Sequence, residues 1–95
     1  MAKIRRLVLD TLKPHEPNII DLANVLSELT GVSAVNISIY ELDRKVENAK
    51  ITIEGEDIAF EEVTHTIEDM GGTIHSIDEV VAGKMIIDDA ATLQD

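Results

Sequence analysis

The sequence predicts an α+β domain in which two helices cover one side of a four-stranded sheet. Three observations lead to this class. Four stretches are rich in β-forming residues or alternate apolar with polar side chains, two stretches repeat apolar residues at helical spacing, and the order is strand, helix, strand, strand, helix, strand. A chain of 95 residues has room for a single core, so we expect one domain.

The first half of the chain predicts a strand, a helix and a second strand. Residues 3–12 are rich in β-forming side chains and stop at Pro14, after which a second proline stiffens the loop. From Asn18 the apolar residues recur at helical spacing, and Gly31 suits the position just beyond the helix end. Residues 32–43 alternate cleanly, so we expect a strand with one dry face.

The second half predicts a hairpin partner, a second helix and a last strand. Residues 48–55 alternate again after a charged link, and this pattern makes a hairpin with the preceding strand. Asp57 can cap a helix whose apolar stripe ends at Gly71 and Gly72. Residues 71–84 then contain the last strand, in which β-forming residues alternate with polar ones.

This order of elements is the split βαβ pattern of the ferredoxin-like sandwich. That fold is a four-stranded antiparallel sheet in the order 4-1-3-2 with both helices on one face. We expect residues 1–84 to form this domain and residues 85–95 to form a tail that adds an edge strand or a subunit contact. The alternation assigns eight apolar side chains to the helix-facing side: Leu7, Leu9, Ile37, Ile39, Ile51, Ile53, Ile74 and Val80.

The composition excludes several classes of function. Nineteen acidic and eight basic residues give a net charge of −11, which repels nucleic acids and anionic membrane surfaces. The chain has no cysteine, which removes disulfides and thiolate metal ligands. We find no export signal and no apolar run long enough to span a membrane, so we expect a cytoplasmic location and neither a nucleic-acid nor a membrane partner.

The charges are unevenly distributed along the chain. Three bases, Lys3, Arg5 and Arg6, crowd its start. Between Lys50 and Lys84 there are nine acidic residues and no Lys or Arg. A basic patch of one subunit could therefore meet an acidic helix of another.

The open face of the sheet, opposite the helices, is predicted to carry a polar cluster. Antiparallel pairing brings the end of the first strand close to the start of the third and fourth strands, and so gathers Asp10, Lys50 and His75. In the same register Ser76 and Asp78 point to the other side. A polar cluster between strands is either a set of solvated ion pairs or part of a binding surface.

The other end of this face is predicted to hold an ion-pair cluster. The early part of the first strand brings Arg6 towards Glu54 and Glu79. An apolar element accompanies the charges, as in the cores of protein interfaces, and consists of Val8, Leu12, Tyr40 and Ile77. The face therefore suits contact with another subunit or with a small ligand.

Two loops contain further candidate groups. In "LKPHEP", His15 and Glu16 could ligate a metal or transfer a proton, or this stretch is a rigid turn in which Glu16 stabilises the helix dipole. In "EGED", residues 54–57, the carboxylates could join those of "ELD", residues 41–43, around Ca²⁺ or another divalent cation. The alternatives here are a capped helix start and a solvated hairpin rim.

The residues taken as site candidates fall into two groups. Small-ligand binding is assigned to Asp10, His15, Lys50 and His75. Metal binding is assigned to Glu41, Asp43, Glu54, Asp57, Asp78 and Glu79.

Four stretches resemble an archaeal family, domain of unknown function 211. They are "LVLDTLKPHEP", "VNISIYELD", "ITIEGEDI" and "IHSIDEVVAGK", which extend over nearly the whole chain. The resemblance implies a ferredoxin-like fold and a homo-oligomer such as a closed ring, and it implies no activity. The family's recurrent stretches contain, in this sequence, Asp10, Lys13, His15, Glu41, Asp43, Glu54, Gly55, His75, Ser76, Asp78, Glu79 and Lys84.

These observations favour a non-enzymatic, homo-oligomeric binding module. Its carboxylates would take a divalent cation or a small ligand near a subunit contact. One alternative is a small acid–base enzyme that uses His15 or His75 with Asp10. Another is a purely structural oligomer that binds no ligand.

Overall fold

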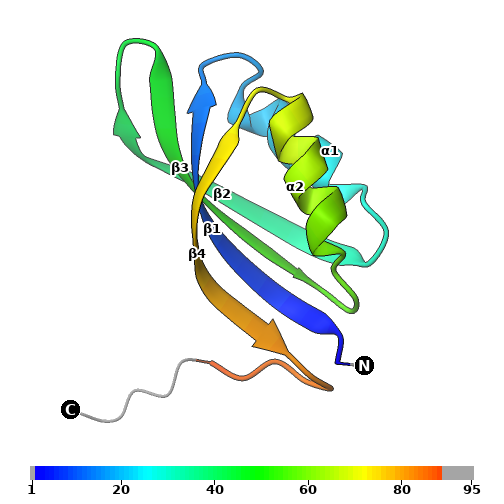
Figure 1. The fold of residues 1–95 in the computed structure, drawn as a ribbon. Helices are drawn as coiled ribbons and strands as arrows, with labels where there is room; N and C mark the ends of the chain where they lie inside the picture. The colour runs from blue at the N-terminus through cyan, green and yellow to red at the C-terminus, as the bar shows by residue number, and fades with distance from the viewer. Residues whose placement is uncertain (1, 89–95) are drawn as a thin grey trace, which may run out of the picture.

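The computed structural model describes residues 2–88 and confirms the predicted α+β class (Figure 1). One antiparallel sheet contains the four strands β1 (Ile4–Pro14), β2 (Val32–Leu42), β3 (Val46–Gly55) and β4 (Thr73–Ala82). The helices are α1 (Ile19–Ser27) and α2 (Phe60–Asp69). The strand order β2-β3-β1-β4 is the predicted order 4-1-3-2 read from the other edge.

A single apolar core lies between the sheet and the helices. Alternate residues of the two central strands enter it, because side chains on a strand point to opposite faces in turn. Both helices contribute residues to the same core, so they cover one face of the sheet and leave the other face open (Figure 1). The buried members of the core are Leu7, Leu9, Leu22, Leu26, Ile51, Ile53, Ile58, Val63 and Ile67.

The helix starts differ in how well the sequence predicts them. Asn18 caps α1 as expected, and its side chain accepts a 3.0 Å hydrogen bond from the Asp21 amide. The prediction that Asp57 caps α2 is wrong, because α2 starts at Phe60 after Ala59, which provides no side-chain cap. Ile58 is buried in the core, and this anchor separates Asp57 from the first turn of the helix.

The strands are longer than predicted at the hairpin end, and β4 is irregular. β1 extends to Pro14, and β3 begins at Val46. The pairing of β4 with β1 shifts register three times along its length. Val80, which we expected to pack under the helices, is 51% exposed, whereas its neighbour Val81 is buried. Val80 nevertheless stands opposite the core residue Leu7, so it keeps the predicted side of the sheet and is exposed because β4 is an edge strand. The shifts change the facing of other residues of β4.

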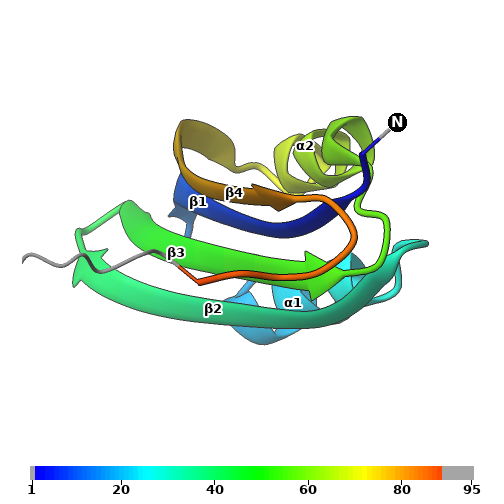
Figure 2. The ribbon, with the colours of Figure 1, turned by 90° about the horizontal axis from the view of Figure 1, so that it is seen from below.

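The chain after β4 turns back under the open face (Figure 2). Gly83 takes a φ of +134° at this turn, and its amide donates a 2.8 Å bond to the Lys3 carbonyl. Residues 85–88 lie in neither a helix nor a strand, and the rest of the predicted tail, residues 89–95, lies outside the described residues. Within residues 2–88 neither helix has the length and apolar character needed to cross a membrane.

Candidate functional site

Arg6 is the centre of a charge cluster on the open face. Its Nε lies 2.8 Å from Glu54 Oε2, its Nη1 3.2 Å from Glu79 Oε2, and its Nη2 3.1 Å from Asp88 Oδ1. The predicted approach of Arg6 to Glu54 and Glu79 is thus confirmed. The hydrogen bond to Glu54, followed by that to Asp88, raises the pKa of Arg6. Asp88 also ties the turned-back chain to this face.

Asp10 and Tyr40 form a second polar contact, two strands apart. The Tyr40 hydroxyl donates a hydrogen bond to Asp10 Oδ1, and this bond is the main reason that the pKa of Tyr40 is raised. Asp10 also stands opposite Lys50 in the register of β1 and β3, as predicted. One oxygen of the Asp10 carboxylate is therefore already engaged by a phenol.

The placement of β4 around Asp10 differs from the prediction. The residue opposite Asp10 is Ser76 and not His75, so Ser76 lies on the open face. Ser76 Oγ donates a 2.7 Å bond to Asp78 Oδ1, and the charge of Asp78 contributes to the raised pKa of Tyr40. The prediction that Ser76 and Asp78 point away from this face is therefore wrong, because a register shift on either side of the Asp10 pair changes which residues of β4 share its face.

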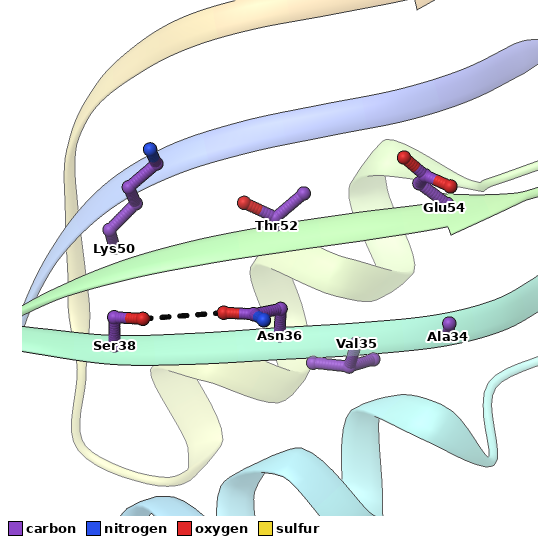
Figure 3. A pocket seen from close by; sticks show the side chains of 7 residues that line it. All are labelled: Ala34, Val35, Asn36, Ser38, Lys50, Thr52 and Glu54. Carbon is purple, nitrogen blue, oxygen red and sulfur yellow. Dashed lines mark hydrogen bonds between the residues drawn. The ribbon is translucent and has the colours of Figure 1, made fainter. Parts of the chain in front are cut away.

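A shallow hollow of about 520 Å³ lies on the open face between β2 and β3 (Figure 3). Lys50, Thr52 and Glu54 border it from β3, and Ala34, Val35, Asn36 and Ser38 border it from β2. Ser38 Oγ donates a 3.3 Å bond to Asn36 Oδ1. Lys50 is exposed and forms no ion pair with a carboxylate of the described residues. The hollow thus holds one ammonium beside hydroxyl and amide groups.

Apolar side chains remain exposed around this face. Leu12 is 39% exposed and Tyr40 57%, whereas Val8 is buried within the chain at 6%. Ile77 is also exposed, but it stands opposite the core residue Leu9, so the prediction that it lies on the open face is wrong. Two of the four predicted apolar members, Leu12 and Tyr40, are therefore free to contact another molecule on this face. Leu42, at the end of the edge strand β2, is also 68% exposed.

A third cluster lies at the other end of the sheet, where the β2–β3 hairpin meets the loop after β1. Lys13 is 2% exposed, and its Nζ donates to Glu47 Oε1 at 3.0 Å and to the Pro14 carbonyl at 2.6 Å. His15 Nδ1 lies 2.8 Å from the other oxygen, Glu47 Oε2. Glu47 therefore joins two cations, and His15 pairs with Glu47 instead of with Glu16 or Asp10.

The surroundings of His15 favour its doubly protonated form. Its Nε2 faces the carbonyl oxygens of Asp43, at 3.0 Å, and Arg44, at 2.8 Å, and both can only accept a hydrogen bond. Its Nδ1 faces the Glu47 carboxylate. The hydrogen bond to Glu47 raises the pKa of His15, and the same bond lowers the pKa of Glu47. Both ring nitrogens are hydrogen-bonded, so His15 links the loop after β1 to the β2–β3 hairpin.

The predicted metal ligands do not come together in one chain. Glu54 and Glu79 are engaged by Arg6, and Asp78 accepts from Ser76. Asp43 Oδ1 accepts from the Arg44 amide, while Glu41 and Asp57 are exposed at separate ends of the sheet. Within residues 2–88 no group of three His, Asp or Glu side chains is arranged to hold a metal ion.

Sequence reasoning missed the role of Glu47. This residue stands in the charged link "RKVEN", which resembles a solvated turn. The pairing of Lys13 with Glu47 could have been predicted from the antiparallel register, because it follows when the two central strands are each lengthened by two residues.

Comparisons with known proteins point to one family. The profile of the family DUF211, described as uncharacterized ArCR, matches residues 5–95. Among curated proteins, the uncharacterized protein MJ0319 of Methanocaldococcus jannaschii is 57% identical over 95 residues, a match that covers 100% of this chain and 98% of that protein.

Proposed function

The chain belongs to the DUF211 family, and we propose that its ferredoxin-like domain is a non-enzymatic module that assembles with copies of itself and binds a small anionic ligand on the open face. One observation carries the proposal. The Lys50 hollow lies against β2, an edge strand whose first nine residues, 32–40, carry no charge. A ligand site and an available sheet edge are thus neighbours.

The state of the two sheet edges supports assembly through β2. In the sheet of the described residues, β2 pairs with β3 alone, so one side of its backbone is free for another strand. Natural proteins protect such edges with charges and bulges, because an unprotected edge pairs with other chains. The opposite edge, β4, has Asp78, Glu79 and three register shifts, whereas β2 has two register shifts but neither charges before Glu41 nor a proline. Edge pairing would also cover the exposed Tyr40 and Leu42.

The chemistry of the hollow supports a small anion as the ligand. Lys50 supplies a positive charge, and the neighbouring side chains of Thr52, Ser38 and Asn36 carry hydrogen-bond donors. Glu54 at the far end is partly neutralised by Arg6. A carboxylate or phosphate group near Lys50 therefore meets donors, and the Asp10 carboxylate opposite Lys50 is engaged at one oxygen by Tyr40.

The alternatives have less support from the geometry. An acid–base enzyme needs a histidine that is free to exchange protons, but His15 is held at both nitrogens and His75 does not stand opposite Asp10. A divalent-cation site would need carboxylates from a second copy, since residues 2–88 of one copy bring no three together. The cytoplasmic location and the absence of nucleic-acid partners stay predictions.

A titration followed by NMR tests the ligand site. We expect inorganic phosphate or citrate to shift the backbone amide signals of residues 34–38 and 50–54, with saturation in the millimolar range that weak single-cation sites show, on the order of 1 mM. Lys50→Gln should abolish the shifts, and Lys45→Gln, in the hairpin turn, should leave them. Equal shifts in both variants, or none in the wild type, would refute the site. A parallel titration with Ca²⁺ tests the alternative that the protein binds a divalent cation.

Light scattering tests assembly through β2. We expect a mass above that of the monomer at micromolar concentration, and a smaller mass for Ser38→Lys, which puts a charge in the middle of the free edge. Asn24→Lys adds the same charge to an exposed position of α1 and should keep the wild-type mass. A monomeric wild type contradicts the proposed assembly.

A further inference from the structure

The start of β1 and the end of β4 enclose a hollow of about 530 Å³ lined by three cations. Its lining residues are Ala2, Lys3, Arg5, Gly83 and Lys84. The chain has only eight Lys and Arg residues, and three of them gather here. None of the three forms an ion pair with a carboxylate of residues 2–88, although acidic residues outnumber basic ones by nineteen to eight. Like charges repel, so this cluster favours an anionic partner.

Arg5 is held in place for such a partner. Its Nε donates to the Gly83 carbonyl and its Nη2 to the Lys84 carbonyl, both at 2.9 Å. These bonds fix the guanidinium between the two strands and use two of its five N–H groups. The remaining N–H groups keep their capacity to bind carboxylate oxygens.

The outer face of α2 has the complementary charge. Val63 and Ile67 face the core, and the exposed acidic side chains are Glu61, Glu62, Glu68 and Asp69. None of these four forms an ion pair with a described residue. Glu61 and Glu68 are seven residues apart, so they lie on one side of the helix about 10 Å apart.

The end of α2 gives an independent reason to expect a cationic partner. Glu68 and Asp69 lie in the last turn, which contains no basic residue. Negative charge at the C-terminal end of a helix opposes the helix dipole and is unfavourable. A cation brought from outside would offset both the dipole and the repulsion between the carboxylates.

We propose that the hollow of Lys3, Arg5 and Lys84 docks on the acidic face of α2 in a second copy of this chain. This inference rests on the proposed assembly and adds to it a head-to-tail contact, because the two surfaces are different parts of one molecule. The contact sets the orientation of the copies, since complementary charges contribute to specificity and association rate more than to affinity.

Charge reversal on each surface, with mixing, tests the contact. We expect Lys3→Glu/Lys84→Glu and Glu61→Lys/Glu68→Lys each to raise the dissociation constant of assembly, measured by light scattering over a dilution series, by tenfold or more. An equal mixture of the two variants should recover assembly, because each variant then offers a surface complementary to the other. The matched controls Arg44→Glu/Lys45→Glu and Glu16→Lys/Glu28→Lys, at exposed positions outside β2 and α2, should assemble as the wild type does. Urea unfolding of every variant verifies that it is folded.

The outcomes separate this inference from the proposal on which it rests. A monomeric wild type overturns both. An oligomeric wild type whose mass survives both charge reversals overturns the docking contact alone. If inorganic phosphate instead shifts the amide signals of Lys3 and Lys84 while both reversals leave the mass unchanged, the hollow binds a small anion and the contact is refuted.

Discussion

Lys13 is almost fully buried in a chain whose charged residues otherwise lie mainly at the surface. A buried ammonium is costly unless it is paired and hydrogen-bonded, and Glu47 with the Pro14 carbonyl meets this requirement. Glu47 uses its second oxygen for His15, so one carboxylate holds two cations and two turns together. The stability of this end of the sheet therefore depends on the protonation of His15 and Glu47.

We predict a pH dependence of stability that follows from these two residues. The folded pKa of His15 is raised above 6.5, so its contribution is complete below pH 6.5 and is lost as the pH rises through the folded pKa. The folded pKa of Glu47 is lowered from 4.5, so its contribution is complete above pH 4.5 and is lost as the pH falls through the folded pKa. His15→Gln should lower the Tm most between pH 4.5 and 6.5 and have less effect at pH 9.

A second histidine provides the control for this prediction. His65 is exposed on α2, and His65→Gln should change the Tm little at any pH in the series. Thermal unfolding measured by circular dichroism from pH 4 to pH 9 gives the comparison. An effect of His15→Gln that stays constant across the series would show that His15 contributes by packing and not by charge.

At the scale of elements, the backbones of two turns lie in close contact at one end of the sheet. The turn after α1 meets the turn after β3, and the Gly31 carbonyl accepts from the Glu56 amide at 3.0 Å. A Cβ on Gly55 would lie 1.9 Å from the Gly31 oxygen, and a Cβ on Gly31 would lie 2.1 Å from the Asp57 oxygen. The contacting atoms belong to the backbone and cannot turn aside as a side chain does. This approach joins β2, β3 and the start of α2, and only glycine allows it.

We predict that Gly55→Ala destabilises the protein by about 3 kcal/mol, because the added methyl group would separate the two turns. The free energy of unfolding from urea titration measures the loss. Gly83→Ala is the comparison, since a Cβ there meets no atom within 4 Å and only the positive φ opposes the change. A cost for Gly83→Ala equal to that for Gly55→Ala would show that backbone conformation, and not the contact between the two turns, sets the penalty.

At the scale of the whole molecule, one core supports both layers. The molecule measures 38 × 35 × 18 Å, and its shortest dimension leaves room for one layer of helices on one sheet. The core contains residues of β1, β3, α1 and α2, so neither helix has an apolar core of its own. We therefore expect the domain to unfold in a single cooperative transition.

Leu26→Ala tests this cooperativity. Leu26 is fully buried on α1, and we expect the change to lower the free energy of unfolding by about 3 kcal/mol. Unfolding followed by far-UV circular dichroism and by the NMR signals of each helix should then show the same, lower midpoint. Val25→Ala, on the same helix at a position that is 40% exposed, should cost less than about 1 kcal/mol. If α1 were lost before α2 in Leu26→Ala, the single-core description would fail.

Much of the candidate site could be predicted from alternation alone, but not all of it. The pairings of Arg6 with Glu54 and Glu79 and of Asp10 with Lys50 follow from regular antiparallel register. The partners of Ser76, Asp78 and His75 do not, because the register shifts in β4 depend on how that strand fits β1 in space. The Tyr40–Asp10 contact spans a strand that lies between them, and alternation does not specify such diagonal contacts.

The sequence by itself determined the order of the elements, the strand order and the apolar side of the sheet, because these depend on periodicity and on local turn residues such as Asn18. Only the tertiary structure decided the helix start at Phe60, the burial of Lys13 against Glu47 and the gathering of Lys3, Arg5 and Lys84. Each of these joins residues far apart in the chain, or depends on a neighbouring anchor such as Ile58, so local pattern carries no signal for it. Long-range packing selects among arrangements that the local pattern permits equally.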